Sequence, residues 1–253
     1  MLIHGMPELP IIKNMQKKTL LILLGLLFTH PLLQASPVIQ HIPKNFVAQF
    51  SLYKSGFPIA ETEYRFTRDK NNASFQHVSL PSGFTSLFSD NKVEEKSTLN
   101  TSENTLKVKT YQFTQTGDKN ISISSRFNWN NKTISTINNQ QPATETRFEH
   151  YVWDKLSTLL ALMSYAHDQS TSIFLHSFDG VKIKKYELKY TGKREIELDD
   201  DEWIVSDIWK RKDGKKQVIF YLDPDKNYFP VKIEQYKNQK LRATLLLKQL
   251  KWL

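Results

Sequence analysis

Along most of the chain after residue 45, apolar and polar residues alternate with a period of two, which predicts a succession of β-strands. The clearest run covers residues 121–129, whose apolar side chains share one face. Asn, Asp and Gly residues separate the runs and predict short turns, so the strands should form a meander of hairpins. Strands are expected at residues 46–52, 60–66, 75–80, 93–99, 106–116, 121–129, 133–137, 172–177, 181–190, 202–210, 217–222, 229–236 and 241–249.

One segment, at about residues 153–167, has the period of a helix instead. Asp154 is a good N-cap residue, and apolar residues follow at i, i+3, i+4 and i+7 from Leu156 to Met163. The apolar stripe is wide, so the helix should be buried on more than one side. The expected fold is therefore mainly β, with a large antiparallel meander forming an open or closed β-barrel around this amphipathic helix.

The N-terminus reads as an export signal. Lys17 and Lys18 precede a short apolar run at residues 20–28, and Ala35 offers a small residue for cleavage. We expect a signal peptide at residues 1–35, a single β-barrel-like domain at 36–253, and a periplasmic location. Met15 would begin a leader of ordinary length, which leaves open that residues 1–14 are a misassigned start. The alternative is an uncleaved membrane anchor, although the run is shorter than the roughly 20 residues that span a bilayer.

The amino-acid composition excludes some kinds of functional site and some classes of partner. The 253 residues include no cysteine, which excludes disulfides, thiolate metal sites and cysteine nucleophiles. The net charge is +9, and it is +7 once residues 1–35 are removed, from 32 basic and 25 acidic residues. Because the lysines are scattered, we expect no nucleic-acid binding, while an anionic membrane surface remains a candidate partner. The protein is expected to be a monomer.

Known catalytic and metal-binding motifs are not found. The five histidines after residue 35 lack metal-binding spacing, and they are expected to be solvated or singly hydrogen-bonded. Glycine-rich phosphate loops and the serine nucleophile motif are also missing, so we expect no cofactor, no metal and no catalytic residues. The histidines are His41, His77, His150, His167 and His176.

Two acidic segments leave alternatives open. Asp223, Asp225 and Glu234 imitate the spacing of a calcium loop, but Tyr228 stands where the loop requires glycine, which favours a hairpin turn. Residues 199–202 hold four adjacent acids, which are interpreted as a solvated turn, with weak cation binding as the alternative.

Three stretches resemble an exported bacterial family, domain of unknown function 3108. Residues 151–160 resemble its "Asp-x-Leu-Ser" helix start, and residues 218–233 resemble its closing hairpin, with Phe229 in place of the usual leucine. The opening residues 53–61 also match, although the family usually has glycine near Ala60. The resemblance covers roughly residues 45–250 and implies no catalytic residues. The same hairpin recurs in periplasmic lipoprotein carriers, whose half-barrel holds acyl chains around a helix, which is a likeness of fold alone.

Two functional hypotheses follow. The first is a non-catalytic protein that binds a lipid or another amphipathic molecule between the sheet and the helix, because several strands are apolar on both faces. Its alternative is that the same side chains form a filled core. The residues expected to line the cavity are Phe127, Trp129, Leu156, Leu160, Met163, Trp203 and Phe220.

The second hypothesis is a scaffold or interaction protein of envelope biogenesis that acts through its surface. Phe84, Leu87 and Phe88 lie in a small-residue loop and would contact an envelope protein, since exposed apolar clusters mark interfaces. The alternative is a loop that packs back on the rim of the barrel. An enzyme acting on envelope glycans is a third hypothesis, with Glu61 and Glu63 as paired carboxylates that could equally form a solvated face.

Overall fold

The computed structural model describes residues 41–102, 105–168, 170–198 and 202–253. These residues belong to one compact unit, Ser36–Leu253. The expected signal peptide at residues 1–35 and the acidic residues 199–201 lie outside the described residues, so the expectations for them stay predictions.

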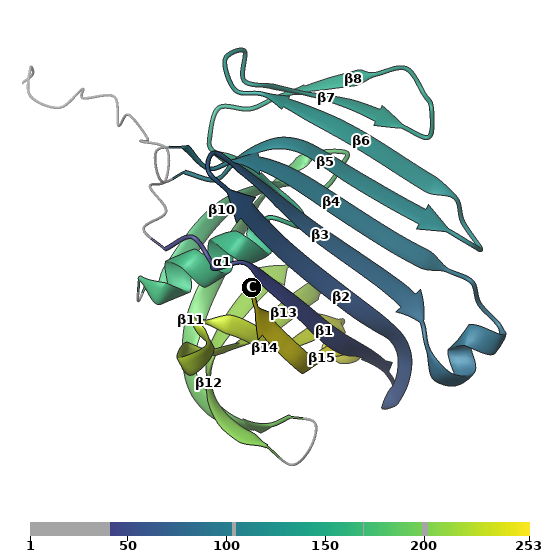
Figure 1. Ribbon diagram of the computed structural model, residues 1–253, viewed down its shortest axis with the longest axis vertical. Helices are drawn as coiled ribbons and strands as arrows, with labels where there is room; N and C mark the ends of the chain where they lie inside the picture. Colours follow the sequence, from purple (N-terminus) through teal and green to yellow (C-terminus); the bar gives the residue numbers. More distant parts are fainter. Residues whose placement is uncertain (1–40, 103–104, 169, 199–201) are drawn as a thin grey trace, which may run out of the picture. The chain divides into compact units, whose positions relative to one another are not determined.

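The described residues form one fifteen-stranded sheet (Figure 1). With one exception, strands that follow one another in the sequence are neighbours in the sheet, and the first and last strands pair with Phe46 opposite Trp252. The strands are β1 (Phe46–Lys54), β2 (Phe57–Asp69), β3 (Asn72–Pro81), β4 (Lys92–Asn100), β5 (Lys107–Thr116), β6 (Ile121–Asn128), β7 (Thr133–Asn138), β8 (Thr144–Arg147), β9 (Val152–Asp154), β10 (Ser172–Phe178), β11 (Ile183–Glu197), β12 (Trp203–Asp213), β13 (Lys216–Asp223), β14 (Phe229–Lys237) and β15 (Lys240–Trp252).

The predicted antiparallel meander is confirmed, with one local exception: β9 runs parallel to β10. The sheet order begins at β8 and ends at β9, and these two edges are not hydrogen-bonded to each other. The structure is therefore barrel-like and open, which decides between the two alternatives left by the sequence.

The sheet has two halves, β1–β8 and β9–β15, which are hydrogen-bonded to each other between β1 and β15. On the open side, the two halves meet through side-chain packing. The rings of Phe127 on β6 and Phe178 on β10 meet edge to face with centroids 5.9 Å apart. Gly180, in the turn after β10, has φ +94°, and a Cβ atom there would lie 2.9 Å from Cδ1 of Ile123. Only glycine allows this backbone to approach β6 so closely.

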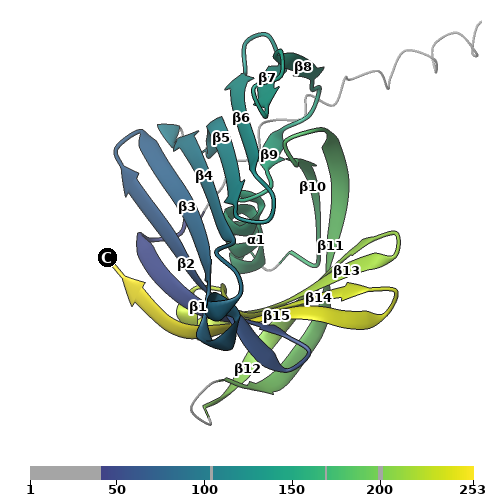
Figure 2. The ribbon, with the colours of Figure 1, turned by 90° about the vertical axis from the view of Figure 1, so that its right-hand side faces the viewer.

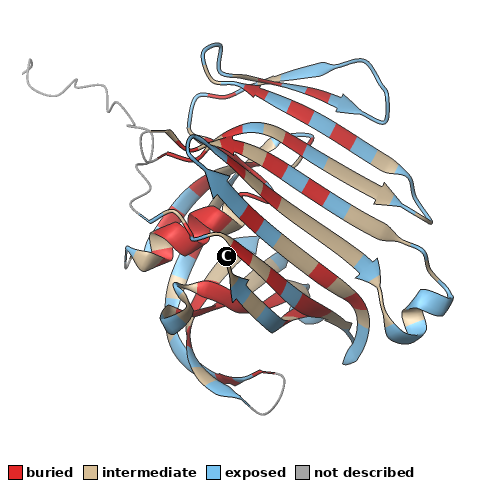
Figure 3. Cartoon of the chain, in the orientation of Figure 1, coloured by how far each residue is buried: buried red, intermediate tan, exposed pale blue. Residues whose placement is uncertain are grey.

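Helix α1 (Thr158–His167) lies between the two halves of the sheet (Figure 2). Leu160, Ala161 and Leu162 are completely buried, and Met163 is 2% exposed. Figure 3 shows the buried residues of α1 beside alternating buried positions on the strands. The prediction of a helix buried on more than one side is confirmed, and this burial supplies the apolar contact that stabilises both halves.

The helix begins later than the sequence predicts. Residues 152–154 form β9 and pair with β10, and the side chain of Asp154 accepts hydrogen bonds from the backbone N–H groups of Leu156 and Ser157, both at 2.9 Å. These bonds hold a turn before Thr158. The capping tendency of Asp154 was correctly identified, but it acts on the turn that leads into the helix.

A cluster of aromatic rings fills the interior where β1 meets β15. The completely buried ring of Phe46 has four aromatic neighbours with centroids 5.0–6.0 Å away. These neighbours are Phe66, Phe75, Phe229 and Trp252.

The acidic segment at residues 223–225 forms a turn. The 3-10 helix η4 (Pro224–Lys226) follows Asp223, whose carboxylate accepts hydrogen bonds from Asp225 N and from Lys226 Nζ, both at 2.9 Å. Because the lysine occupies this carboxylate, the geometry favours the hairpin-turn interpretation over a calcium loop. Among the described residues, no helix has the length and hydrophobicity needed to cross a membrane.

Candidate functional site

A cavity of about 170 Å³ lies beside the N-terminal half of α1. A cavity of similar size in an engineered protein core holds one benzene molecule, so this one accommodates a ring or a short alkyl chain. The side chains around it come from both halves of the sheet and from the segment leading into α1. They are Tyr64, Glu95, Lys155, Leu156, Thr158, Leu159, Leu175, Tyr186, Leu188, Arg211, Val218, Phe220, Ile233, Gln235 and Leu245.

The wall of the cavity is amphipathic. The strands β10 and β13–β15 contribute mainly aliphatic and aromatic side chains, whereas Glu95, Lys155 and Arg211 bring three charges to the same space. Binding sites for small molecules typically combine a largely apolar wall with a few fixed polar groups. This cavity has that composition.

Glu95 is the centre of the polar wall. It lies on β4 and is 6% exposed, because the alternation of the strand turns it inward together with Ser97 and Leu99. Its carboxylate accepts hydrogen bonds from Tyr111 Oη and from Lys155 Nζ, both at 2.8 Å. Lys155 itself remains 54% exposed, so one partner of this ion pair is buried and the other is accessible to solvent.

The surroundings of Glu95 keep it ionised. Burial alone would raise the pKa of this carboxyl, but the polar contact of His77 and the positive charge of Lys155 outweigh burial and lower the pKa to about 2. The His77 Nδ1 to Glu95 Oε1 distance is 3.6 Å, longer than a well-formed hydrogen bond, so Lys155 is the closer partner. A carboxylate with so low a pKa is a weak general base, and it serves here to position Lys155 and Tyr111.

A second buried carboxylate, Asp154, holds the start of the helix in place. It is completely buried, and its Oδ1 atom accepts a hydrogen bond from Ser97 Oγ at 2.8 Å. Burial raises its pKa to about 6, although hydrogen bonds from Ser157 and Ser97 oppose the increase and the nearby charge of Glu95 adds to it. These contacts link β4 directly to the turn that leads into α1.

Arg211 supplies a cation that is not neutralised by an ion pair. Its guanidinium lies over the ring of Tyr186, with Cζ 4.3 Å from the ring centroid. Within the described part of the chain, this guanidinium has no ion-pair or hydrogen-bond partner, which leaves its N–H donors available. Burial lowers the pKa of Arg211, while Tyr186 and Asp213 oppose the decrease. A guanidinium in this setting binds a carboxylate or phosphate favourably.

The cavity brings together two of the seven residues expected to line it, Leu156 and Phe220. Phe127, Leu160 and Met163 are buried in the core, with exposed fractions of 6%, 0% and 2%. Trp129 is partly buried, and its Nε1 donates a hydrogen bond to the carbonyl of Val108 at 2.6 Å. The structure corrects the prediction for Trp203, which is 59% exposed at the first position of β12 and does not line the cavity.

Sequence reasoning missed the polar residues of the cavity. Glu95 shares the face of Leu99 in a predicted strand, and this pattern could have shown that an acidic residue points inward. Lys155 follows Asp154, the expected N-cap residue, and Arg211 lies between Lys210 and Lys212. Neither residue carries a sequence signal that identifies its partner.

The loop residues expected to form an interface are exposed. Phe84, Leu87 and Phe88 are 76%, 72% and 74% exposed, and they lie in or directly after the 3-10 helix η1 (Gly83–Leu87). The loop therefore does not bury them against the rim of the barrel.

The paired carboxylates of the third hypothesis are occupied by surface contacts. Glu61 accepts a hydrogen bond from Ser51 Oγ at 3.1 Å, and Glu63 pairs with Arg65 at 3.0 Å. Neither glutamate lines the cavity.

Comparison with known proteins supports the fold. A family model described as "Protein of unknown function (DUF3108)" matches residues 49–245. A solved structure, described as a β-barrel-like protein of domain of unknown function DUF1849 from Brucella abortus, is similar with a TM-score of 0.52 and 9% identity. The similarity covers 82% of this chain and 97% of that chain, and at this identity it concerns the fold alone. None of the curated proteins matches the chain.

The low pKa of Glu95 predicts a pH-dependent stability. Because the pKa falls from 4.5 to about 2 on folding, ionised Glu95 stabilises the fold above pH 4.5, and this contribution disappears as the pH falls toward 2. The difference in free energy of unfolding between the wild type and Glu95→Gln should be on the order of 3 kcal/mol near pH 6 and roughly half of that at pH 3. Urea unfolding at several pH values measures it.

Glu94→Gln is the matched control for this experiment. Glu94 is adjacent on β4 and points outward, and its ion pair among the described residues is with Lys92 at the surface. Its substitution should change the stability little at any of these pH values. A difference between wild type and Glu95→Gln that does not vary with pH would contradict the assignment.

Proposed function

Because the chain belongs to the DUF3108 family, which is described as having unknown function, we propose a function from the cavity itself. The protein is a non-catalytic binding protein for a small amphipathic anion. The observation that carries this proposal is the guanidinium of Arg211, which no described residue pairs with, beside a largely apolar cavity wall.

The charges on the wall favour an anion over a cation or a neutral molecule. Glu95 is already bound by Lys155 and Tyr111, so it has little capacity left for a ligand cation. None of the described residues occupies the N–H donors of Arg211, and the exposed ammonium of Lys155 can contact a second anionic oxygen while it stays paired with Glu95. A carboxylate would therefore bind between these two cations.

The apolar wall favours a short hydrophobic group attached to that anion. Val218 and Phe220 on β13 and Leu245 on β15 line the cavity, and β14 lies between these two strands. The volume of about 170 Å³ is too small for a complete phospholipid, and Leu160 is completely buried rather than exposed to the cavity. We therefore narrow the expected lipid-like ligand to a short acyl chain, or to the end of a longer molecule that remains partly outside.

Octanoate tests this proposal because it combines a carboxylate with a short alkyl chain. Isothermal titration should show that octanoate binds to the full chain, whereas octylammonium, which has the same chain and the opposite charge, binds at least tenfold more weakly. Arg211→Met should weaken octanoate binding by tenfold or more, since it removes the charge and keeps an apolar side chain of similar length.

Arg242→Met is the matched control, since Arg242 is exposed on β15 and does not line the cavity. It should leave octanoate binding unchanged. Failure of the wild type to bind octanoate, or equal effects of the two arginine substitutions, would exclude the proposed site.

The proposed location is the periplasm, after export and cleavage following Ala35. Support comes from the basic and apolar pattern of residues 17–28 and from the small residue at 35. Fractionation of a bacterial host with N-terminal sequencing measures this directly, and we expect a periplasmic chain that begins at Ser36. A cytoplasmic chain with an intact N-terminus would exclude export.

A second candidate function is suggested by the exposed loop. The rings of Phe84 and Phe88 contact each other with centroids 4.8 Å apart, and Phe57, at the start of neighbouring β2, is also 72% exposed. We propose that this apolar tip inserts into an anionic membrane surface, since the chain is basic and aromatic side chains bind at the membrane interface.

Replacement of Phe84, Leu87 and Phe88 by serine tests this second function. The full chain should sediment with phosphatidylglycerol vesicles, and the triple substitution should reduce the bound fraction several-fold. Val205→Ser removes another exposed apolar side chain, which lies on β12, and should have no effect. Equal sedimentation of the wild type and the triple variant would exclude membrane binding through this loop.

A further inference from the structure

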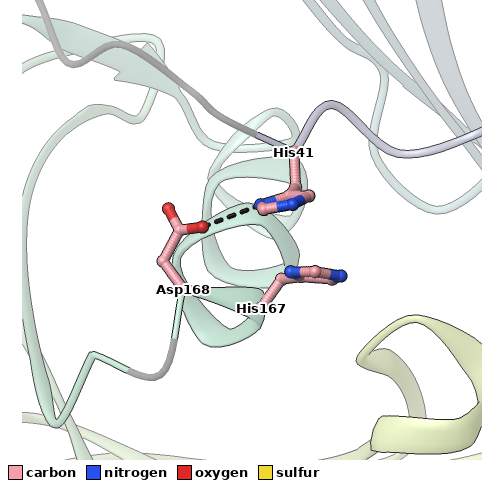
Figure 4. A group of neighbouring side chains, drawn as sticks. All are labelled: His41, His167 and Asp168. Atoms are coloured by element: carbon pink, nitrogen blue, oxygen red, sulfur yellow. Dashed lines mark hydrogen bonds and ion pairs between the residues drawn. The ribbon is translucent and has the colours of Figure 1, made fainter.

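The C-terminal end of α1 brings together three side chains that are typical metal ligands (Figure 4). His167 is the last residue of the helix, Asp168 follows it, and His41 comes from the segment that precedes β1. One ligand atom from each residue lies within 4.8 Å of the other two. The three residues belong to segments 127 positions apart in the sequence, so the fold alone creates this group.

The contacts within the group are close. His41 Nδ1 and Asp168 Oδ1 are 2.8 Å apart and share a hydrogen bond. The rings of His41 and His167 stack with centroids 3.6 Å apart and an interplanar angle of 25°. Figure 4 shows the two imidazoles one above the other, with the carboxylate of Asp168 directed at His41.

One atom of the group has no partner in the described part of the chain. His167 Nδ1 is buried, and no hydrogen-bond donor or acceptor among the described residues reaches it. The ring of Tyr228 covers His167 edge-on, with centroids 5.6 Å apart. A buried nitrogen without a partner is unfavourable unless something binds it.

The electrostatic setting favours a cation at this position. The last carbonyl groups of a helix are not used within the helix, and the C-terminal end carries a partial negative charge. Asp168 adds a full negative charge, and its side chain is 24% exposed. A divalent ion would bind two imidazole nitrogens and one carboxylate oxygen, and it would lie near the negative end of α1.

From this geometry we infer that His41, His167 and Asp168 form a binding site for a divalent transition metal of the zinc type. Two imidazoles and one carboxylate suit zinc, copper or nickel, whereas calcium and magnesium prefer oxygen ligands. Ligand atoms around a tetrahedral zinc ion are roughly 3.3 Å apart, so the 2.8 Å contact has to open by about half an ångström. Water would complete the coordination.

The consequence of metal binding is a cross-link between the segment before β1 and the end of α1. Because the ion binds the folded chain, it should raise the melting temperature in proportion to the logarithm of its concentration. This inference does not depend on the proposed anion-binding function.

Titration of the untagged full chain with zinc chloride at pH 7.5 tests the inference. Calorimetry should show binding, and a thermal melt should show a zinc-dependent increase in melting temperature. His41→Ala and Asp168→Asn should each weaken zinc binding by at least tenfold and reduce the increase. Circular dichroism of each variant without zinc establishes that it is folded.

His176→Ala serves as the matched control. His176 stacks with His150 in a second histidine pair, with ring centroids 4.5 Å apart, and it is not part of the group at the end of α1. This variant should bind zinc as the wild type does.

Three results would overturn the inference. The first is a wild-type chain that binds no zinc. The second is zinc binding that His41→Ala and Asp168→Asn leave unchanged, because the metal would then bind elsewhere. A loss of stability in His41→Ala that is equal with and without zinc would show that the pair acts only through its hydrogen bond, which also overturns the metal site.

Discussion

The burial of α1 between the two halves of an open sheet is the interaction on which the rest of the structure depends. The edge strands β8 and β9 are not hydrogen-bonded to each other, so hydrogen bonds between strands do not close the sheet into a barrel. The buried side chains of α1, with the edge-to-face contact of Phe127 and Phe178, fill the space between the halves. The buried Asp154 then links β4 to the start of the helix through Ser97 and Ser157.

Both candidate sites follow from where this helix begins and ends. At its beginning, the turn held by Asp154 places Lys155 next to Glu95 and leaves a cavity in front of Arg211. At its end, His167 and Asp168 meet His41. The same packing that stabilises the fold therefore positions the proposed anion site and the proposed metal ligands at opposite ends of the helix.

Much of the fold could be predicted from the sequence because it is a local property. The period of two along β6 identified its buried face, including Ile123 and Phe127, and the period of the residues after Asp154 identified the only helix expected. The family resemblance agreed with both. The start of the helix was placed too early, since the pairing of residues 152–154 with β10 depends on a distant strand.

The candidate sites could be predicted only in part, because they depend on which distant segments meet. Of the residues named from the sequence, Leu156 and Phe220 line the cavity, whereas Trp203 is exposed outside it. Periodicity assigns a residue to a face and does not show whether another element covers that face. The pairing of Glu95 with Lys155, and that of His41 with Asp168, joins residues that are 60 and 127 positions apart, and no local pattern indicates either contact.

Hydrogen exchange in a Leu160→Ala variant tests the central role of α1 most directly. Leu160 is completely buried, and its truncation should lower the free energy of unfolding by about 2–5 kcal/mol. If the helix holds both halves of the sheet, amide protection in β4 and in β10–β13 should decrease together and by similar amounts. Loss of protection confined to α1, with both halves of the sheet unchanged, would contradict this account.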